Sequence, residues 1–248
     1  MYIKPEHIDI HCHVIPGVDD GAPYFPEAIM MLKRLAMQGV ETVFATPHSW
    51  AIYDAAESSE MRERFWFLQD EIALRKIPIS LYLGCEMAVS AKTLDRCLDY
   101  VRSGIYPTMN GTKYILTELP QLCLFDEASK CVKGIVSAGY TPIIAHAERY
   151  VFADEFTIRD LKAIGALVQI NAYSILNEAN ESVRRAANAL LRHKLVDFIG
   201  SDAHGISHRP PKVSDGIDAI VQMCGAEYAE QILNVNPKKL LETGESVY

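Results

Sequence analysis

The sequence predicts an α/β protein in which parallel strands and covering helices form a distorted (β/α)7 barrel of the TIM type. Short apolar runs alternate with segments of helical pattern, and most of these runs end in a histidine or a carboxylate. Consecutive strand–helix–strand units produce a parallel sheet with right-handed crossovers. Seven such units in 248 residues are one fewer than in the eight-fold barrel. Because no linker or shift in composition divides the chain, we expect a single domain over residues 1–248.

The predicted strands are rich in Ile, Val, Leu, Phe and Thr and lack a clean alternation of apolar and polar residues. This pattern is typical of parallel strands that are buried on both faces. In chain order, strands are expected at His7–Val14, Glu41–Thr46, Ile79–Glu86, Lys113–Leu119, Thr141–His146, Ala166–Asn171 and Leu195–Ser201.

The segments between the strands carry apolar residues at helical spacing. The first helix is expected at Pro26–Gln38, and Gly39 follows it, where glycine favours the end of a helix. Further helices are expected at Glu57–Arg75, Asp126–Ala138 and Glu178–His193, with short covering helices at Ser214–Cys224, Glu227–Leu233 and Pro237–Leu241.

Composition and charge exclude several classes of protein. Hydrophobic residues make up 49% of the chain and charged residues 23%, as in a globular protein. The net charge of -8 argues against a sequence-independent nucleic-acid binder, which needs Lys and Arg to displace counterions. No stretch has the length and apolar character of a signal peptide or membrane span. We therefore expect a cytoplasmic protein that binds no nucleic acid and does not insert into membranes.

The C-terminal ends of the predicted strands carry a set of potential metal ligands. His11 and His13 are two residues apart in one strand, so their side chains point to the same side. Charged side chains on core strands are almost never fully buried unless they are paired or bind a metal. The joint pattern therefore predicts a metal centre at the mouth of the barrel. Its other candidates are His48, Glu86, Glu118, His146, Asp202 and His204, with Asp19 or Asp20 nearby.

Histidines and carboxylates without a thiolate suit Mn²⁺, Fe²⁺ or Zn²⁺. The candidates outnumber the three or four ligands of one zinc ion, so two or three ions are expected. Clustered ions can clamp a phosphoryl group and supply a hydroxide. Each residue alone also has an ordinary explanation, such as a turn position for His48 or a surface position for Glu118.

Two arginines are candidates for binding an anionic substrate. Arg149 follows His146 by three residues, and a guanidinium beside a metal cluster suits bidentate recognition of phosphate. The alternative is an ion pair of Arg149 with Glu148 or Asp154. Arg209 is a second candidate in the segment before two prolines.

The ordered set of motifs resembles the PHP (polymerase and histidinol phosphatase) superfamily over nearly the whole chain. Within it, the sequence is most similar to the bacterial manganese-dependent tyrosine phosphatases of the CpsB/CapC type, which are linked to capsule and exopolysaccharide synthesis. The motifs are His11-x-His13, Val18-Asp19-Asp20-Gly21-Ala22, Thr46-Pro47-His48, Gly84-x-Glu86, Glu118, Ile144–Tyr150, and Ser201-Asp202-Ala203-His204 leading to Arg209-Pro210-Pro211.

This resemblance implies a PHP fold, three metal ions, and a bacterial tyrosine kinase as the phosphotyrosine protein on which the enzyme acts. One ion would be held by His11, His13, Glu86 and Asp202. A second would share Glu86 and use Glu118 and His146, and the third would use Asp20, His48 and His204. Arg149 and Arg209 would hold the phosphate.

The expected reaction is hydrolysis of phosphotyrosine, whose phenolate leaving group has a pKa of about 10 and needs less acid assistance than an alkoxide. Trp50 or Tyr53 could stack on the substrate ring. No cysteine is followed six positions later by arginine, so the chain lacks the spacing of cysteine-dependent phosphatases.

Three alternatives remain open from the sequence. The first is a small-molecule phosphatase such as histidinol phosphatase. The second is an amidohydrolase, a family that commonly places a metal-bridging lysine on the fourth strand, where this chain has Glu118. The third is a non-catalytic, metal-stabilised scaffold that binds a tyrosine kinase.

Overall fold

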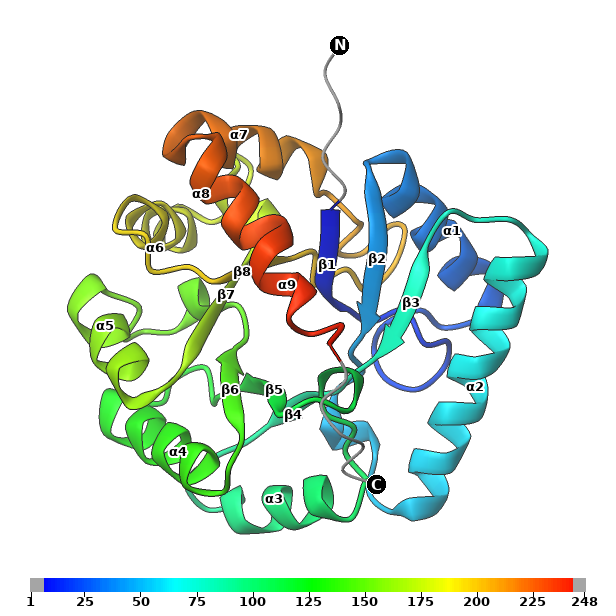
Figure 1. The fold of residues 1–248 in the computed structure, drawn as a ribbon, viewed down its shortest axis with the longest axis horizontal. Helices are drawn as coiled ribbons and strands as arrows, with labels where there is room; N and C mark the ends of the chain where they lie inside the picture. Colours follow the sequence, from blue (N-terminus) through cyan, green and yellow to red (C-terminus); the bar gives the residue numbers. More distant parts are fainter. Residues whose placement is uncertain (1–6, 243–248) are drawn as a thin grey trace.

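The computed structural model describes residues 7–242, in which parallel strands alternate with helices (Figure 1). The first sheet has the order β1-β2-β3 and comprises β1 (His7–Cys12), β2 (Val40–Ala45) and β3 (Ser80–Leu83). The second has the order β4-β5-β6-β7-β8 and comprises β4 (Glu86–Ala88), β5 (Tyr114–Glu118), β6 (Thr141–Ile144), β7 (Leu167–Asn171) and β8 (Phe198–Gly200). Neighbouring strands are parallel in both sheets, so the predicted α/β class is confirmed.

The prediction of one strand over Ile79–Glu86 is wrong, because the structure divides this segment between β3 and β4, which belong to different sheets. Gly84 lies at the break, where a side chain would come within 2.8 Å of Met109 Sδ. A glycine in a strand pattern often marks such a close approach. The break makes Glu86 the first residue of a strand and not the last, and residues 7–242 hold eight strands instead of the predicted seven.

Two isolated bridges connect the sheets. Cys12 at the end of β1 pairs with Ala203, which follows β8, and His48 after β2 pairs with Glu86 of β4. A small apolar cluster contains residues from both sheets, so their strands pack around a shared interior. Its members from the strands are Ile8, Ile10, Phe44, Leu116, Ile143 and Phe198.

Helices surround the strands (Figure 1). Five helices, α1, α2, α4, α6 and α7, lie within a few residues of the ranges predicted from the sequence. Two others, α3 and α5, lie where the sequence analysis predicted no helix. The last short helices lie beside β1 and β8. The bounds are α1 (Phe25–Met37), α2 (Ala55–Leu74), α3 (Leu94–Arg102), α4 (Phe125–Ser137), α5 (Glu155–Ile164), α6 (Glu181–Arg192), α7 (Ser214–Cys224), α8 (Ala226–Glu230), a π-helical segment (Gln231–Val235) and α9 (Asn236–Lys238).

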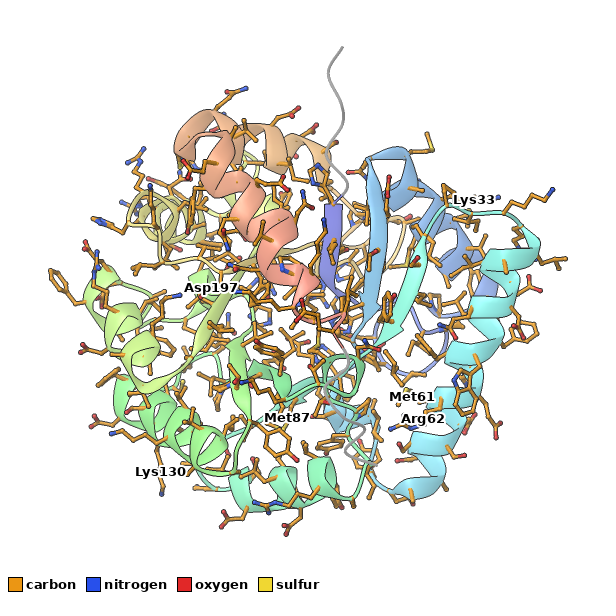
Figure 2. All side chains as sticks on the ribbon, in the orientation of Figure 1. Lys33, Met61, Arg62, Met87, Lys130 and Asp197 are labelled. Carbon is orange, nitrogen blue, oxygen red and sulfur yellow. The ribbon has the colours of Figure 1, made fainter. Side chains whose placement is uncertain are left out.

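The distribution of side chains follows the sequence pattern. Lys33 of α1 and Lys130 of α4 are exposed and point away from the body of the protein, whereas Met87 of β4 is buried among the strands (Figure 2). Within residues 7–242, no helix combines the length and the apolar character needed to cross a bilayer.

Candidate metal centre

The predicted ligands meet in one place. Glu86, which is fully buried, lies at the centre. Its Oε2 atom is 3.2 Å from both His11 Nε2 and His13 Nε2 and 2.9 Å from His48 Nδ1. Its Oε1 atom is 2.9 Å from His146 Nε2. Side chains from well-separated parts of the chain therefore converge on one carboxylate.

The first group that could hold an ion consists of His11, His13 and Asp202. The two histidine Nε2 atoms face each other at 3.1 Å, and Asp202 Oδ1 lies 3.6 Å and 3.5 Å from them. All three side chains are buried. Two imidazole nitrogens and a carboxylate oxygen directed at one point form the donor set of a divalent cation.

Two further groups adjoin the first. One consists of His48, Glu86 and Glu118, and His146 Nε2 lies 3.8 Å from Glu118 Oε1 at its edge. The other consists of His13, His48, His204 and Asp20. Asp20 Oδ1 lies 3.6 Å from His48 Nε2 and 3.5 Å from His204 Nε2. The geometry differs from the ligand sets implied by the resemblance, because His13 and His48 each face two groups.

The three groups of side chains suit bound cations, because several of their buried polar atoms lack hydrogen-bond partners. Within the described part of the chain, Glu86 Oε2, His48 Nδ1 and His204 Nε2 make no hydrogen bond. Buried polar groups are normally satisfied, so such atoms point to a missing partner. Burial and the nearby His13 lower the pKa of His204 to about 2.

Asp19 and Asp20, which the sequence did not distinguish, have different positions. Asp20 is exposed and faces His48 and His204, whereas Asp19 Oδ2 lies 2.7 Å from His13 Nδ1. Asp19 also accepts hydrogen bonds from the backbone N–H groups of His48 and Gly21, each at 2.9 Å. Burial lowers the pKa of His13, but the carboxylates of Asp19 and Glu86 outweigh burial and raise it to about 10. Asp19 thus orients His13, as carboxylates commonly orient metal-binding histidines.

β7 contributes two buried amides to the cluster. Gln169 Oε1 accepts a hydrogen bond from the backbone N–H of His146 at 2.7 Å and lies 3.2 Å from His11 Nδ1. Gln169 Nε2 donates to Asn171 Oδ1 at 2.8 Å, and Asn171 Nδ2 donates to Asp202 Oδ2 at 2.9 Å. Amides are poor metal ligands but form hydrogen bonds readily, and here they connect the backbone of His146, the ring of His11 and the carboxylate of Asp202.

Arg149 and Arg209 both approach the carboxylates of the cluster. Arg149 Nη2 lies 2.8 Å from Asp202 Oδ2, so neither of the ion pairs considered as alternatives is the one formed. Arg209 Nη2 lies 3.2 Å from Asp20 Oδ2, and its Nη1 lies 3.7 Å from Asp202 Oδ2. His146, Asp202 and Arg209 have positive φ angles of 34°, 52° and 44°. Such conformations cost about 1–3 kcal/mol each and cluster at functional sites.

The two predicted aromatic contacts differ in position. The ring of Trp50 lies 5.0 Å from the ring of His48, so Trp50 borders the cluster while remaining half-exposed. Tyr53 is more exposed, and its backbone contacts are to the Glu57 carboxylate and the Tyr100 hydroxyl. The structure therefore brings Trp50, but not Tyr53, beside a predicted ligand.

Comparison with known proteins identifies relatives of the whole described chain. Residues 7–242 match the sequence profile of the family described as capsular polysaccharide synthesis, CpsB/CapC. The tyrosine-protein phosphatase CpsB of Streptococcus pneumoniae is 29% identical over 243 residues, which cover 94% of this chain and 98% of that protein. The tyrosine-protein phosphatase YwqE of Bacillus subtilis is 28% identical over 222 residues, which cover 89% and 86%.

A solved structure has the same arrangement. It comes from the crystal structures of YwqE from Bacillus subtilis and CpsB from Streptococcus pneumoniae, described as unique metal-dependent tyrosine phosphatases. Its TM-score is 0.83 at 28% sequence identity, and the likeness covers 95% of this chain and 94% of the other.

Proposed function

Because the chain belongs to the CpsB/CapC family of capsular polysaccharide synthesis, we propose that it is a metal-dependent phosphatase that hydrolyses phosphotyrosine in proteins. The observation that carries this proposal is the convergence of imidazole and carboxylate groups around Glu86. The names of the relatives, tyrosine-protein phosphatases, support the reaction.

Eight of the nine proposed ligands belong to the three overlapping groups, and the ninth, His146, lies at the edge of one of them. We propose two or three divalent ions, because these nitrogen and oxygen donors without a thiolate suit Mn²⁺, Fe²⁺ or Zn²⁺. The resemblance to manganese-dependent phosphatases favours manganese, with iron or zinc as the alternatives. When bound, such ions supply Lewis acidity and an activated water. The ligands are His11, His13, Asp20, His48, Glu86, Glu118, His146, Asp202 and His204.

Arg149 and Arg209 supply the protein's own positive charge to the reaction. Both guanidinium groups are about one-third exposed and so can reach a substrate at the surface of the cluster. We propose that they bind the phosphate oxygens and stabilise the charge that develops on them. The phenolate of tyrosine, with a pKa of about 10, can leave with little help from a general acid.

We also propose that the two sheets close into one distorted barrel of the TIM type, in which β3 and β4 take the place of a single strand. The bridges from β1 to the segment after β8 and from the segment after β2 to β4, together with the shared interior cluster, support this closure. The functional groups of such barrels lie at the C-terminal ends of the strands. Because the proposed ligands range from β1 to the segment after β8, the whole chain would act as one domain.

The proposed substrate is a bacterial tyrosine kinase that controls capsule or exopolysaccharide synthesis. The family description, capsular polysaccharide synthesis, supports this class of partner. A cytoplasmic location is part of the same proposal, and the six free cysteines agree with a reducing compartment.

The proposal is tested by phosphate release from a phosphotyrosine peptide with Mn²⁺, after chelation, and after Mn²⁺ is restored. We expect chelation to abolish activity and Mn²⁺ to restore it. His11→Ala should lower kcat/KM by at least about 100-fold, because it removes a proposed ligand. His193→Ala is the matched control, since His193 is half-exposed at the end of α6 and pairs with Glu155. Unchanged rates after complete metal removal would contradict the proposal.

A second pair of variants tests the arginine. Arg149→Ala should lower kcat/KM by about 10- to 100-fold, the range for a charge-assisted hydrogen bond. Arg159→Ala is its control, because Arg159 forms only a surface pair with Glu155 on α5. If the two variants have the same kcat/KM, Arg149 does not bind the phosphate as proposed.

A further inference from the structure

A cavity of about 510 Å³ opens beside the metal centre. Its lining includes Arg149 and Arg209, which both face the candidate ligand Asp202, and also Tyr173 and Pro210. The volume lies within the range of pockets that enclose small molecules. The cavity is therefore large enough for more than a phosphate group.

The charge of this cavity sets it apart from another hollow at the cluster. Its lining includes Arg149, Arg209 and Lys212, and its one acidic group, Asp202, already faces both arginines. The other hollow, of about 320 Å³, includes Glu118 and no basic residue. The guanidinium groups of Arg149 and Arg209 therefore make this cavity, and not the other hollow, the one that suits an anionic group.

Tyr173 forms a fixed aromatic part of the cavity wall. It lies in the segment after β7, and its hydroxyl donates a hydrogen bond to the backbone carbonyl of Glu178 at 2.9 Å. Lys212 Nζ lies 5.2 Å from the centre of the ring and 2.6 Å from the Glu178 carboxylate. These contacts hold the ring in place, so a planar ligand would meet a preorganised surface.

Building on the phosphatase function proposed above, we propose that this cavity binds the aromatic ring of phosphotyrosine, with Tyr173 as the residue that selects aryl over alkyl phosphates. Arg149 and Arg209, which face the candidate ligand Asp202, hold the phosphate, and Tyr173 and Pro210 contact the ring. This proposal replaces the sequence-based expectation that Trp50 or Tyr53 stacks on the substrate, because those residues are not among the residues that line the cavity.

The test measures binding and not turnover, by titrating Mn²⁺-loaded full-length protein with phenylphosphonate and methylphosphonate. These probes share the phosphonate anion and differ in the ring. We expect phenylphosphonate to bind about tenfold more tightly, as a good aromatic contact allows. Tyr173→Ala should reduce this preference to less than about twofold and leave the affinity for methylphosphonate unchanged. Tyr173→Phe should retain the preference, because it keeps the ring.

Two controls complete the design. Trp50→Ala and Tyr53→Ala should each retain the preference for phenylphosphonate. Equal binding of the two probes by the wild-type protein overturns the proposal, and so does loss of the preference in the Trp50 or Tyr53 variant but not in Tyr173→Ala. Failure of the phosphatase function would look different: the wild-type protein would prefer phenylphosphonate yet release no phosphate from a phosphotyrosine peptide.

Discussion

The carboxylate of Asp202 has two oxygens with different surroundings. Oδ2 accepts a hydrogen bond from Asn171 at 2.9 Å and lies 2.8 Å from the Arg149 guanidinium. Oδ1 faces the ring nitrogens of His11 and His13. Burial raises the pKa of Asp202, but the charges of His11 and Arg149 outweigh burial and hold it well below its ordinary value. His11 and Arg149 thus keep the group ionised, and Oδ1 is directed at the candidate cation position.

The amides of β7 lead to a prediction about metal affinity. Gln169→Leu removes the acceptor for His11 and His146 and the donor for Asn171 while nearly keeping the volume of the side chain. We expect Mn²⁺ affinity to fall by about 10- to 100-fold, the usual effect of removing a group that orients a ligand. Isothermal titration calorimetry and the electron paramagnetic resonance spectrum of bound Mn²⁺ would measure the change.

Gln69→Leu is the matched control for this prediction. Gln69 also donates a hydrogen bond from its side chain, to the backbone carbonyl of Leu81 at 2.9 Å, but it lies on α2 away from the ligands. The control should bind Mn²⁺ as the wild-type protein does. If Gln169→Leu also keeps full affinity, the β7 amides do not position the ligands.

Sequence reasoning finds ligands more readily than the groups that support them. His11 at the end of β1 and His13 just after it are two residues apart, so alternation places them on the same side, and their chemistry makes them candidates. Asp19 and Gln169 have ordinary residue types for a turn and a strand, and their roles depend on contacts with residues distant in sequence, as between Gln169 and His11. Only the tertiary structure specifies those contacts.

Among the helices, α5 is capped at its N-terminus by Asp154, and the contribution of this cap to stability depends on pH. Asp154 accepts hydrogen bonds from the backbone N–H groups of Phe156 and Thr157 at 2.9 Å and 3.0 Å. Slight burial raises the pKa of Asp154, but the hydrogen bonds from Thr157 and Phe156 lower it below its ordinary value of 3.8. The stabilisation is therefore complete above the unfolded pKa and is lost as the pH falls through the lower, folded pKa.

Asp154→Ala should lower the free energy of unfolding by about 0.5–2 kcal/mol at pH 7. Asp154→Asn is the control, since asparagine caps helices nearly as well but does not titrate in this range. Urea unfolding across pH 7 to 3 should show the wild-type protein losing stability relative to the Asn variant below the ordinary value of 3.8. Equal stability of the Ala and wild-type proteins at pH 7 would argue against the cap.

The end of β8 packs so closely against β1 that it requires glycine. A side chain at Gly200 would lie 2.7 Å from His11 Cβ and 3.0 Å from Gln169 Nε2. Gly200→Ala should therefore displace His11, lower Mn²⁺ affinity and reduce stability by about 1–3 kcal/mol. Calorimetric titration and urea unfolding would measure the two effects.

Gly139→Ala is the control that separates a loss of stability from a loss of Mn²⁺ affinity in Gly200→Ala. Gly139 has a φ angle of 91°, and no atom lies within 4 Å of the position that a Cβ atom would take there. Alanine at this position therefore costs conformational energy without a clash. This control should lose about 1–2 kcal/mol of stability and keep its metal affinity. If Gly200→Ala binds Mn²⁺ with wild-type affinity, the close packing of Gly200 against His11 does not position His11 for metal binding.

Across the whole molecule, the sequence predicts the order of strands and helices but not their division into sheets. Periodicity and strand composition are local signals, and they place most elements within a few residues. The break between β3 and β4 depends instead on the fit of Gly84 against Met109, a contact between segments that are distant in sequence. The candidate ligands other than Asp20 lie at or just beyond a strand segment, whatever sheet that strand joins, so local patterns are enough to single them out.

The candidate ligands connect the two sheets. His11, His13 and His48 belong to β1, the segment after it and the segment after β2, whereas Glu86 and Asp202 belong to β4 and the segment after β8. Few direct backbone pairings join the sheets at these positions, namely the bridges from Cys12 to Ala203 and from His48 to Glu86. A bound cation would therefore add contacts where the two sheets meet and would stabilise the folded chain over the unfolded one.

Mn²⁺ at 100 times its dissociation constant should stabilise the protein by about 2.7 kcal/mol for one site, which raises Tm by about 5 to 10 °C. Differential scanning calorimetry over a Mn²⁺ series measures this shift. Glu86→Ala, which removes the central carboxylate, should lose most of it, whereas Asp154→Ala should start from a lower Tm and show the full shift. A Tm independent of Mn²⁺ in protein shown to bind the metal would mean that the ions do not hold the two sheets together.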